Sequence, residues 1–539
     1  MVHFARLATA VAVLAAGCSS GVCRTISADA GDDRAVTVGT LVMLSAEGTT
    51  STDRRSLSYS WKLVSRPAGS ATSLDPAGGQ GYFTSLVPDV PGDYTVRLRV
   101  LGSCTSDAMV TVTASPTEPV VAIPSALYGN LGKPVTLDAS GSHEVGGGAV
   151  SFAWTLTAKP EGSVAALADE RKGVVRLAAD KEGVYTVHLV VTGAKEVSRD
   201  ITVTVWRALD PVTFRPIDAE YDRPLDRVVA VSDKPPALHL YEAAAGQDEV
   251  IALPVAPTCV SVSPDGKAAA VGHDTWVSFV DLEAKTVVKT WPTTIPAGDV
   301  VATDPLTLAD HTSRIAYLFP HREYYARIHA IDASNGGEIA GSGDQRVYEG
   351  GRFRLQPGSS HLFHITLNLS PQSLFRWDFD PATGALAPGG QALNAWRYPI
   401  GSNLWVSEDG AQILVAAGTR FSTSDMTYSG EMTLAAHAAL AWADAPAAPS
   451  AAEGKWLVQP TGDAWASPDD TNDLSLWTYD AQDLANPEQT ELPKLGLGAV
   501  AHPLHGRYVF FDKAGTKKIS VAQIDADAGV LDDFVILTF

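Results

Sequence analysis

The stretch that decides the fold of most of this chain is TCVSVSPDGKAAAVGHDTWVSFVDLEAKTVVKTW, from Thr258 to Trp291. Short apolar runs alternate with polar turns, a pattern that predicts a strand, a turn, a second strand, a short loop and a third strand. The same span also contains Cys259, His273 and Asp274, which suggests a catalytic site as the alternative. Repetition of the pattern along the chain decides between these two interpretations.

The unit recurs from residue 208 to the end of the chain. Its second-strand element is repeated as DRVVAVSD, GKAAAVG, SRIAYLF, SHLFHIT, AQILVAA, GKWLVQP and GRYVFFD. Seven units over this length give about 47 residues each, close to the roughly 40 to 50 residues of a four-stranded propeller blade. We therefore predict a seven-bladed β-propeller over residues 208–539, closed by pairing of the terminal DDFVILTF with strands of the first blade.

The predicted blades also indicate where a ligand would bind. The turns between first and second strands, such as PDG (Pro264 to Gly266), EDG (Glu408 to Gly410) and PLHG (Pro503 to Gly506), are short and alike. The loops between second and third strands differ: DKPP, HDT, PHREYY, NLSPQS, GTRF, TGDAWASPDDTND and KAGTK. Divergent loops on a rigid scaffold commonly carry recognition. The candidate ligand-binding residues are Arg322, Tyr324, Tyr325, Arg420, Trp465, Asp469 and Asp470.

SPDGKAAAVGHDTWVSFVDLEAKTVVKTW resembles the YVTN-type repeat of bacterial surface proteins and lactonase-like propellers. This resemblance implies either a binding propeller or, as the alternative, a hydrolase whose site lies at the channel mouth. Catalytic motifs are not found: the sequence has no G-x-S-x-G, H-E-x-x-H, paired C-x-x-C or phosphate-binding loop. We therefore predict no catalytic residue, and the chain is expected not to be an enzyme.

Histidines and acidic residues are the candidate metal ligands. His361 and His364 lie three apart on a predicted strand, so their side chains point to opposite faces and cannot share a metal. The run SPDDTND offers oxygen ligands in Asp469, Asp470 and its neighbours without EF-hand spacing. We predict no cofactor, with calcium at this loop as the alternative.

A second repeat lies before the propeller. YSWKLVSRPAGSATSL (Tyr59 to Leu74) and FAWTLTAKPEGSVAAL (Phe152 to Leu167) share an aromatic, a Trp and Pro-x-Gly-Ser at equal offsets. PGDYTVRLRV and EGVYTVHLVV then alternate apolar and polar residues, which is typical of half-buried strands. We predict two antiparallel sandwiches, over residues 28–114 and 119–206.

VTLDASGS, FAWTL and GVYTVHLVV resemble the PKD family of extracellular domains. That resemblance implies immunoglobulin-like spacer or binding modules without catalytic residues. The first copy departs from the family pattern at LSAEGTTS. The complete fold prediction is all-β, with two PKD-type sandwiches followed by the propeller.

The N-terminus carries a targeting signal. His3 and Arg6 precede an apolar run that is too short to span a bilayer as a helix, which is typical of a secretory signal. LAAGC resembles the lipobox of bacterial lipoproteins, and this implies a signal peptide over residues 1–17, lipid on Cys18 and a tether over residues 18–27. By the same resemblance, Ser19 favours the outer membrane, facing the periplasm or the cell surface.

The net charge indicates which partners are disfavoured, and the cysteines indicate the redox state of the compartment. The formal net charge of -21 disfavours nucleic acid as a partner, because phosphate backbones repel an acidic surface. An oxidising compartment allows a disulfide, and Cys23 with Cys104 is the predicted pair, since the sandwich entry and the turn holding Cys104 lie at the same end. Cys259 is predicted to be a small buried residue.

These predictions define an envelope lipoprotein whose propeller binds protein or glycan without catalysis. The membrane is contacted through the lipid anchor only. A propeller hydrolase and a scaffold of an outer-membrane complex are the alternatives.

Overall fold

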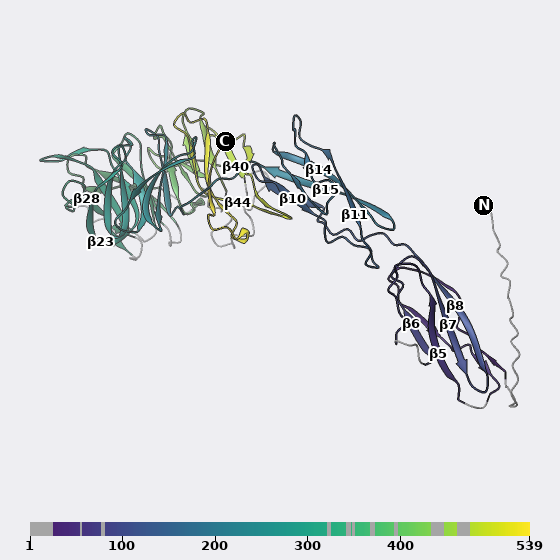
Figure 1. The fold of residues 1–539 in the computed structure, drawn as a ribbon. Coiled ribbons are helices and arrows are strands. Elements are labelled where there is room, and N and C mark those ends of the chain that lie inside the picture. Colours follow the sequence, from purple (N-terminus) through teal and green to yellow (C-terminus); the bar gives the residue numbers. More distant parts are fainter. Residues whose placement is uncertain are drawn as a thin grey trace. The chain divides into compact units, whose positions relative to one another are not determined.

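The computed structural model describes residues 25–53, 56–76, 81–320, 325–340, 346–347, 351–366, 372–392, 397–432, 447–460 and 475–539. Their regular structure is β-strand with short 3₁₀ turns, so the all-β prediction is confirmed (Figure 1). The chain divides into two compact units, one of residues 1–127 with 132–204 and the other of residues 128–131 with 205–539. Within the described residues, no helix is long and apolar enough to cross a bilayer.

The first repeat folds as an immunoglobulin-like sandwich. One sheet has the order β2-β8-β7-β5, and the second contains β3 and β6. A buried core including Trp61 and Tyr94 fills the space between them. The strands are β1 (Ile26–Ser27), β2 (Arg34–Thr37), β3 (Val42–Ser45), β4 (Thr50–Ser51), β5 (Ser58–Ser65), β6 (Phe83–Leu86), β7 (Gly92–Leu101) and β8 (Thr105–Ser115).

The second repeat has the same architecture, with sheets β11-β14-β15-β9 and β10-β13-β12. Trp154 pairs with Leu189 across β11 and β14, just as Trp61 pairs with Leu98 across β5 and β7. The strands are β9 (Ala126–Asn130), β10 (Val135–Asp138), β11 (Ser151–Ala158), β12 (Leu167–Ala168), β13 (Val174–Leu177), β14 (Gly183–Thr192) and β15 (Glu196–Trp206). The equal register confirms that the two segments are copies of one domain.

The C-terminal unit is a β-propeller built from meandering sheets. In four of them the strand order follows the sequence: β17-β18-β19-β20, β30-β31-β32-β33, β34-β35-β36-β37 and β38-β39-β40-β41. Each pair is antiparallel, as short polar turns dictate.

The strands of these four sheets are β17 (Asp218–Asp222), β18 (Arg227–Asp233), β19 (Pro236–Glu242), β20 (Gln247–Ala252), β30 (Arg352–Leu355), β31 (His361–Ile365), β32 (Leu374–Phe379), β33 (Leu386–Gln391), β34 (Leu404–Val406), β35 (Gln412–Val415), β36 (Thr419–Ser422), β37 (Tyr428–Glu431), β38 (Ala447–Ser450), β39 (Lys455–Val458), β40 (Ser475–Asp480) and β41 (Glu488–Glu491).

A longer, five-stranded sheet has the order β21-β22-β23-β26-β28, and the stretch from Thr258 to Trp291 supplies most of β21, all of β22 and the first part of β23. Strand β23 pairs with β22 through its first half and with β26 through its second half. The strands are β21 (Pro257–Val262), β22 (Ala268–Asp281), β23 (Thr286–Ala302), β26 (Ile315–Pro320) and β28 (His329–Asp332). Shorter pairs are β24 (Leu306–Thr307) with β25 (Thr312–Ser313), β27 (Ala326–Arg327) with β29 (Arg346–Val347), and β42 (Leu495–Leu497) with β43 (Val500–His502).

The last sheet closes the ring, and here the sequence prediction needs correction. Its order is β16-β46-β45-β44, with β16 (Pro211–Val212), β44 (Leu504–Phe511), β45 (Lys518–Ile524) and β46 (Phe534–Thr538). The C-terminal strand pairs with β45 and with β16, which precedes the first full sheet, and not with strands of that sheet. Both ends of the propeller therefore contribute to one sheet.

The same sheet shifts the predicted seventh unit by one strand. GRYVFFD belongs to β44, which is the first strand of its sheet. The KAGTK segment is therefore a first-to-second-strand turn, and Gly515 bonds back to Asp512 as Gly266 bonds back to Ser263. PLHG lies at the start of β44, and the second-to-third-strand loop of this sheet is the segment between β45 and β46, with a 3₁₀ turn at Ala526–Ala528.

Candidate functional site

Most of the predicted ligand-binding residues cannot be placed. Arg322, Tyr324, Trp465, Asp469 and Asp470 lie outside the described residues, as do Cys18 and Cys23. Cys104 is disulfide-bonded. Because Cys23 is not described, the Cys23–Cys104 pairing stays a prediction.

The prediction that Arg420 binds a ligand is wrong. Its side chain is only 6% exposed. It donates hydrogen bonds to the carbonyl oxygens of Ala481, Gln482 (2.9 Å) and Ser429 (2.6 Å). These acceptors belong to its own sheet and the next one, so the guanidinium holds two sheets together and offers little to a ligand.

Tyr325 stays a candidate. Its ring is 51% exposed, and the Arg346 guanidinium lies 5.8 Å from the ring centre. Two further apolar side chains are exposed: Trp276 (38%), in β22 directly after Thr275 with its positive φ, and Leu531 (99%), in the segment between β45 and β46. Leu531 was not found from the sequence, because the last unit was shifted by one strand and its second-to-third-strand loop was placed elsewhere.

The geometry of the sheets fixes which end of the channel these loops surround. The inner strand is the first strand of each sheet, next to the channel. Its first residue pairs with the last residues of the second strand, as Asp218 does with Val231 and Arg352 with Ile365. The second-to-third-strand loops therefore emerge at the end where inner strands begin. We call this end the channel mouth.

A cavity of about 280 Å³ lies at the channel mouth. A second cavity of about 260 Å³ lies toward the opposite end, and both are lined by Arg354 and Trp405, so these side chains lie between them. The mouth cavity is lined by Asp218, Ala219, Arg352, Arg354, Ser402, Asn403, Trp405, Ala416, Ala447, Gly506, Arg507, Tyr508, Val509 and Phe510.

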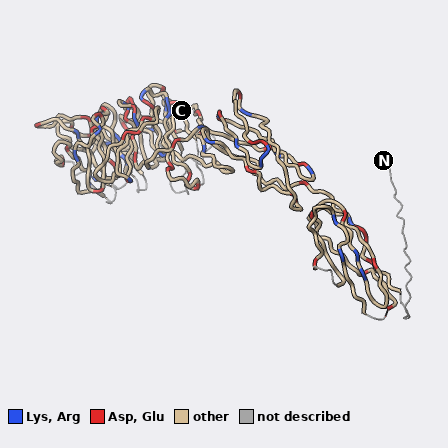
Figure 2. The backbone as a smooth tube through the Cα atoms, viewed as in Figure 1, with Lys and Arg blue, Asp and Glu red and all other residues tan. Residues whose placement is uncertain are grey.

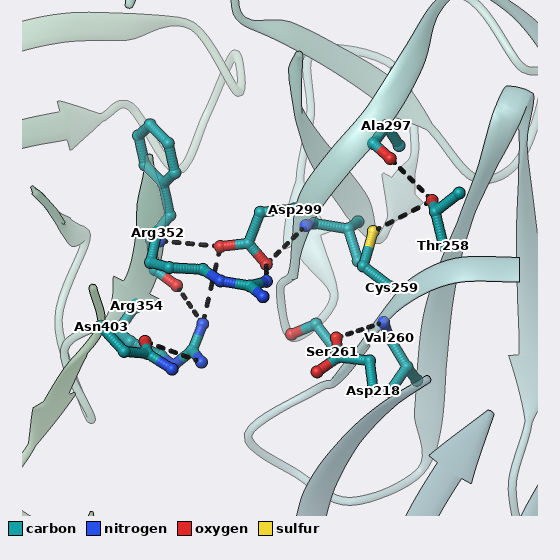
Figure 3. A network of polar contacts seen from close by, with 12 residues as sticks. Asp218, Thr258, Cys259, Val260, Ser261, Ala297, Asp299, Arg352, Arg354 and Asn403 are labelled. Carbon is teal, nitrogen blue, oxygen red and sulfur yellow. Dashed lines mark hydrogen bonds and ion pairs between the residues drawn. The ribbon is translucent and has the colours of Figure 1, made fainter. Parts of the chain in front are cut away.

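Polar side chains at the beginnings of inner strands connect neighbouring sheets. Asp218 accepts hydrogen bonds from the backbone N–H of Ala219 and, on the next inner strand, of Val260, both at 3.0 Å. Asp299 accepts from the N–H of Val300 and, on β30, of Phe353 at 2.8 Å (Figure 3). Inner strands of different sheets do not pair, so these carboxylates satisfy N–H groups that would otherwise lack partners.

Two arginines of β30 face this carboxylate network. Arg352 and Arg354 are two residues apart, so their side chains point to the same face of the strand. Their Nη1 atoms lie 3.5 and 3.6 Å from the Asp299 carboxylate oxygens (Figure 3). Burial lowers the pKa of Arg352, but the charges of Asp299 and Asp218 outweigh it and raise that pKa above its ordinary value.

Burial raises the pKa values of two acidic groups in the channel, whereas it lowers that of an arginine. Burial raises the pKa of Asp218, while Arg352 opposes this shift. Burial also raises the pKa of Glu220 to about 7, despite the charge of Arg354 and a bond from the Val262 N–H. The channel therefore holds carboxylates that are reluctant to carry charge beside arginines that remain charged.

The channel mouth, where the hydrolase alternative would place its site, brings together Asp218, Asp299 and Asn403. Each of the three accepts from the backbone N–H of the next residue in the chain. Asn403 also accepts from Arg354 at 3.3 Å. Among the described residues, no group of three His, Cys, Asp or Glu side chains is placed to hold a metal ion.

A Ser–His–Asp arrangement that sequence reasoning missed lies across β18, β19 and β20. His239 Nε2 is 2.9 Å from Ser232 Oγ, and His239 Nδ1 is 2.8 Å from Asp248 Oδ2. Ser232 is only 1% exposed and also bonds to the Pro235 carbonyl, while Phe214 stacks on the imidazole ring at 3.7 Å. The hydroxyl cannot reach a substrate in this structure, so the row holds the strands together.

The equivalent row in β22 and β23 supports this interpretation. His273 Nε2 lies 2.8 Å from Ser278 Oγ, which lies 2.8 Å from Thr290 Oγ1. In this row the histidine precedes the serine along the chain, and no carboxylate takes part. Such rows stabilise a sheet whichever order their members take, because each buried polar group finds a partner.

The other singled-out residues also have structural roles. Cys259 is buried on β21 with its pKa raised by burial and by Asp299, as expected of a packing residue. His361 bonds to Asp378 at 2.6 Å, whereas His364 is buried between Phe353 and Phe375. The strand carrying both histidines is confirmed, and their side chains have separate surroundings.

The sequence does contain a signal for the missed network. Asp218 begins β17, Asn403 directly precedes β34, and Asp299 lies near the beginning of the part of β23 that pairs with β26. Aligning the units on their first strands would have revealed this repeated polar position. Aligning them on the stronger second strands hid it.

Comparison with known protein families identifies the second sandwich. Residues 130–205 match a PKD domain family, which confirms the predicted resemblance for this part of the chain. No curated protein matches the chain.

Several solved structures resemble the chain weakly. The β-propeller domain of Cps50 (Swd1) from Myceliophteria thermophila is 10% identical, with 61% of this chain and 99% of that chain covered and a TM-score of 0.39. Hsv2 from Kluyveromyces lactis is 11% identical over 61% of this chain and 98% of that chain, with a TM-score of 0.37. Hydrazine synthase from Kuenenia stuttgartiensis is 13% identical over 61% and 88%, with a TM-score of 0.30.

Proposed function

We propose that this chain is a non-enzymatic binding protein of the bacterial cell envelope. A lipid on Cys18 anchors it to the outer membrane, the two sandwiches act as spacers, and the propeller binds a protein partner at the channel mouth. Glycan is the alternative ligand. The charge distribution supports a protein partner over nucleic acid, because Lys and Arg are interspersed with Asp and Glu along the described chain (Figure 2).

We count the propeller sheets as seven blades. The five-stranded sheet supplies two of them, because β23 serves as the last strand of one and the first strand of the next. Seven such blades of the YVTN type leave a central channel. The rows of polar side chains within the blades and the carboxylates between them make the ring a rigid support for its loops.

The observation that carries the proposal is the cavity at the channel mouth. It opens at the end from which the variable loops emerge. Tyr325 and Leu531 are exposed on those loops, and Trp276 is exposed in β22 directly after the variable segment HDT. Exposed aromatic and large apolar side chains are enriched in protein-binding surfaces.

Site-specific photo-crosslinking in the native cell tests this proposal. A photoreactive amino acid replaces Trp276 or Leu531 at the channel mouth, and Ser359 or Asp409 on turns at the opposite end serves as the matched control. We expect one discrete protein adduct from the first pair and none from the second. Adducts from the opposite end alone, or from all four positions equally, would overturn the assignment of the binding face.

The anchor is tested separately. Cys18→Ala should move the protein from the membrane to the soluble envelope fraction, and Cys259→Ala should leave it with the membrane. Retention of the Cys18→Ala protein in the membrane fraction would contradict lipid anchoring at this residue.

A further inference from the structure

The charges around the channel-mouth cavity are unusual for so acidic a protein. Three arginines line it, Arg352, Arg354 and Arg507, against one lining carboxylate, Asp218. With Asp218 and Asp299 both counted as ionised, and with Glu220 left out because it lines the other cavity, one positive charge remains in excess at the mouth. A single negative charge from a ligand would balance the site.

The three arginines differ in what they can offer. Arg507 donates two bonds to Gln523, at 3.1 and 2.8 Å. Arg354 donates to the Phe353 carbonyl at 2.7 Å and to Asn403. Among the described residues, the Arg352 guanidinium has only the 3.5 Å ion pair with Asp299, whose oxygens already accept backbone N–H groups.

The Arg352 guanidinium therefore keeps N–H donors for a ligand. It is about one third exposed, and it lines the cavity. A guanidinium presents its donors as a planar fork that matches the two oxygens of a carboxylate. The salt link to Asp299 fixes the arginine in place, which reduces the entropy lost when a ligand orders it.

We propose that the channel mouth binds a carboxylate group of the protein partner, with Arg352 as its main donor. The inference rests on the proposed binding function and names the group recognised. The carboxylate comes from an acidic side chain or from a chain end that enters the cavity. Trp405, Val509 and Phe510 line the same cavity, so the aliphatic part of such a group packs against apolar walls.

A doubly charged phosphate fits the site less well. It would exceed the single positive charge and bring its second charge close to Asp218 and Asp299. The site should therefore discriminate between a carboxylate and inorganic phosphate. This discrimination provides the test.

The experiment is isothermal titration calorimetry on the full chain at constant ionic strength. The probes are N-acetyl-glutamate amide for an acidic side chain, N-acetyl-alanine for a chain end, N-acetyl-glutamine amide as the neutral analogue, and inorganic phosphate. We expect at least one carboxylate probe to bind, and to bind at least tenfold more tightly than the neutral analogue or phosphate. The preferred carboxylate probe identifies the source of the group.

Variants assign the binding to Arg352. Arg352→Gln should weaken the carboxylate probe at least tenfold, and Arg352→Lys should give an intermediate affinity because it keeps the charge without the fork. Arg171→Gln, on an exposed turn of the second sandwich, makes the same charge change and should bind as the parent does. Near-ultraviolet circular dichroism verifies that each variant is folded, and the lysine variant keeps a partner for Asp299.

Two results would overturn the inference: equal carboxylate affinity in the parent and the folded Arg352→Gln protein, or tighter binding of phosphate than of either carboxylate. If the crosslinks at Trp276 and Leu531 persist, either result would still leave protein binding at the channel mouth supported. Conversely, absence of those crosslinks with intact carboxylate binding would leave the cavity assignment standing and remove the protein partner.

Discussion

Glu220 shows how burial within the channel sets the chemistry of a single residue. It lines the cavity at the far end from the mouth, and its pKa is raised from 4.5 to about 7. Between these values the folded protein binds more protons at this site than the unfolded chain does. The free energy of unfolding of the propeller should therefore fall as pH rises from about 4.5 to about 7.

Glu220→Gln should remove this dependence. The variant keeps an oxygen for the Val262 N–H but cannot ionise, so it should exceed the parent in stability at pH 8 by at most about 3 kcal/mol. The two proteins should converge below pH 4.5. Denaturant unfolding at a series of pH values measures the difference, with the exposed Glu118→Gln as the control. A constant difference at every pH would contradict the raised pKa.

Arg420 shows why residue-level prediction of the site largely failed. An arginine in a variable loop suggests a ligand donor, but the sequence does not show that carbonyl oxygens of its own sheet and of the neighbouring sheet accept its hydrogen bonds. Arg352 presented the opposite problem. It lies in the segment GRFRL, outside the variable loops, and only the position of β30 in the ring places it on the channel.

At the scale of elements, the two sandwiches repeat a carboxylate that ties together a turn and a strand. In the first copy, Asp89 accepts from Ser70 Oγ, the Ala71 N–H, Thr72 Oγ1 and the Tyr94 hydroxyl. Asp180 in the second copy accepts in the same way from Ser163, Val164 and Tyr185. The shared Pro-x-Gly-Ser sequence therefore marks a structural turn.

Asp89→Asn should destabilise the first sandwich by about 2 kcal/mol at pH 7, because an amide cannot accept the same set of bonds. Burial raises the pKa of Asp89, but the bonds from Ser70, Thr72, Ala71 and Tyr94 outweigh it and hold the pKa well below its usual range. Stability from the carboxylate is thus present above about pH 4 and lost as pH falls below it. The gap between parent and variant should narrow on acidification.

Thermal unfolding followed by calorimetry between pH 2 and 7 checks this expectation. Asp32→Asn, at an exposed position of the same sandwich, provides the control. A gap that widens at low pH would show that the carboxylate does not stabilise the folded sandwich in its charged form.

The sequence could predict elements that have a local pattern, but not elements whose position depends on distant parts of the chain. Strands with strict alternation, such as β7 and β14, and turns with a glycine at positive φ, such as Gly266 and Gly410, carry local signals and were placed correctly. β16 has only two residues, Pro211 and Val212, and no local pattern distinguishes it from a linker. Its pairing with β46 depends on ring closure, so the last unit was shifted and its exposed loop was missed.

At the scale of the whole propeller, stability should depend on the pairing of β16 with β46, which we call the seam. Val212 and Val535 lie on adjacent strands of the closing sheet, and both are buried. They belong to different cores: Val212 packs with Phe214 and Tyr241, and Val535 packs with Leu457 and Leu504. A direct contact between the two side chains therefore does not couple them.

Val535→Asp should destabilise the propeller by about 3 to 5 kcal/mol, because it buries an unpaired charge. Val212→Asp should act in the same direction, whereas Val530→Asp, in an exposed loop, should change little. If closure of the ring is one cooperative event, the double variant should lose clearly less than the sum of the single losses, since the first substitution already opens the seam. Calorimetry of the propeller transition gives the three values. Additivity within about 0.5 kcal/mol would mean that the two cores unfold independently and that β16 is a covering strand, not a closure.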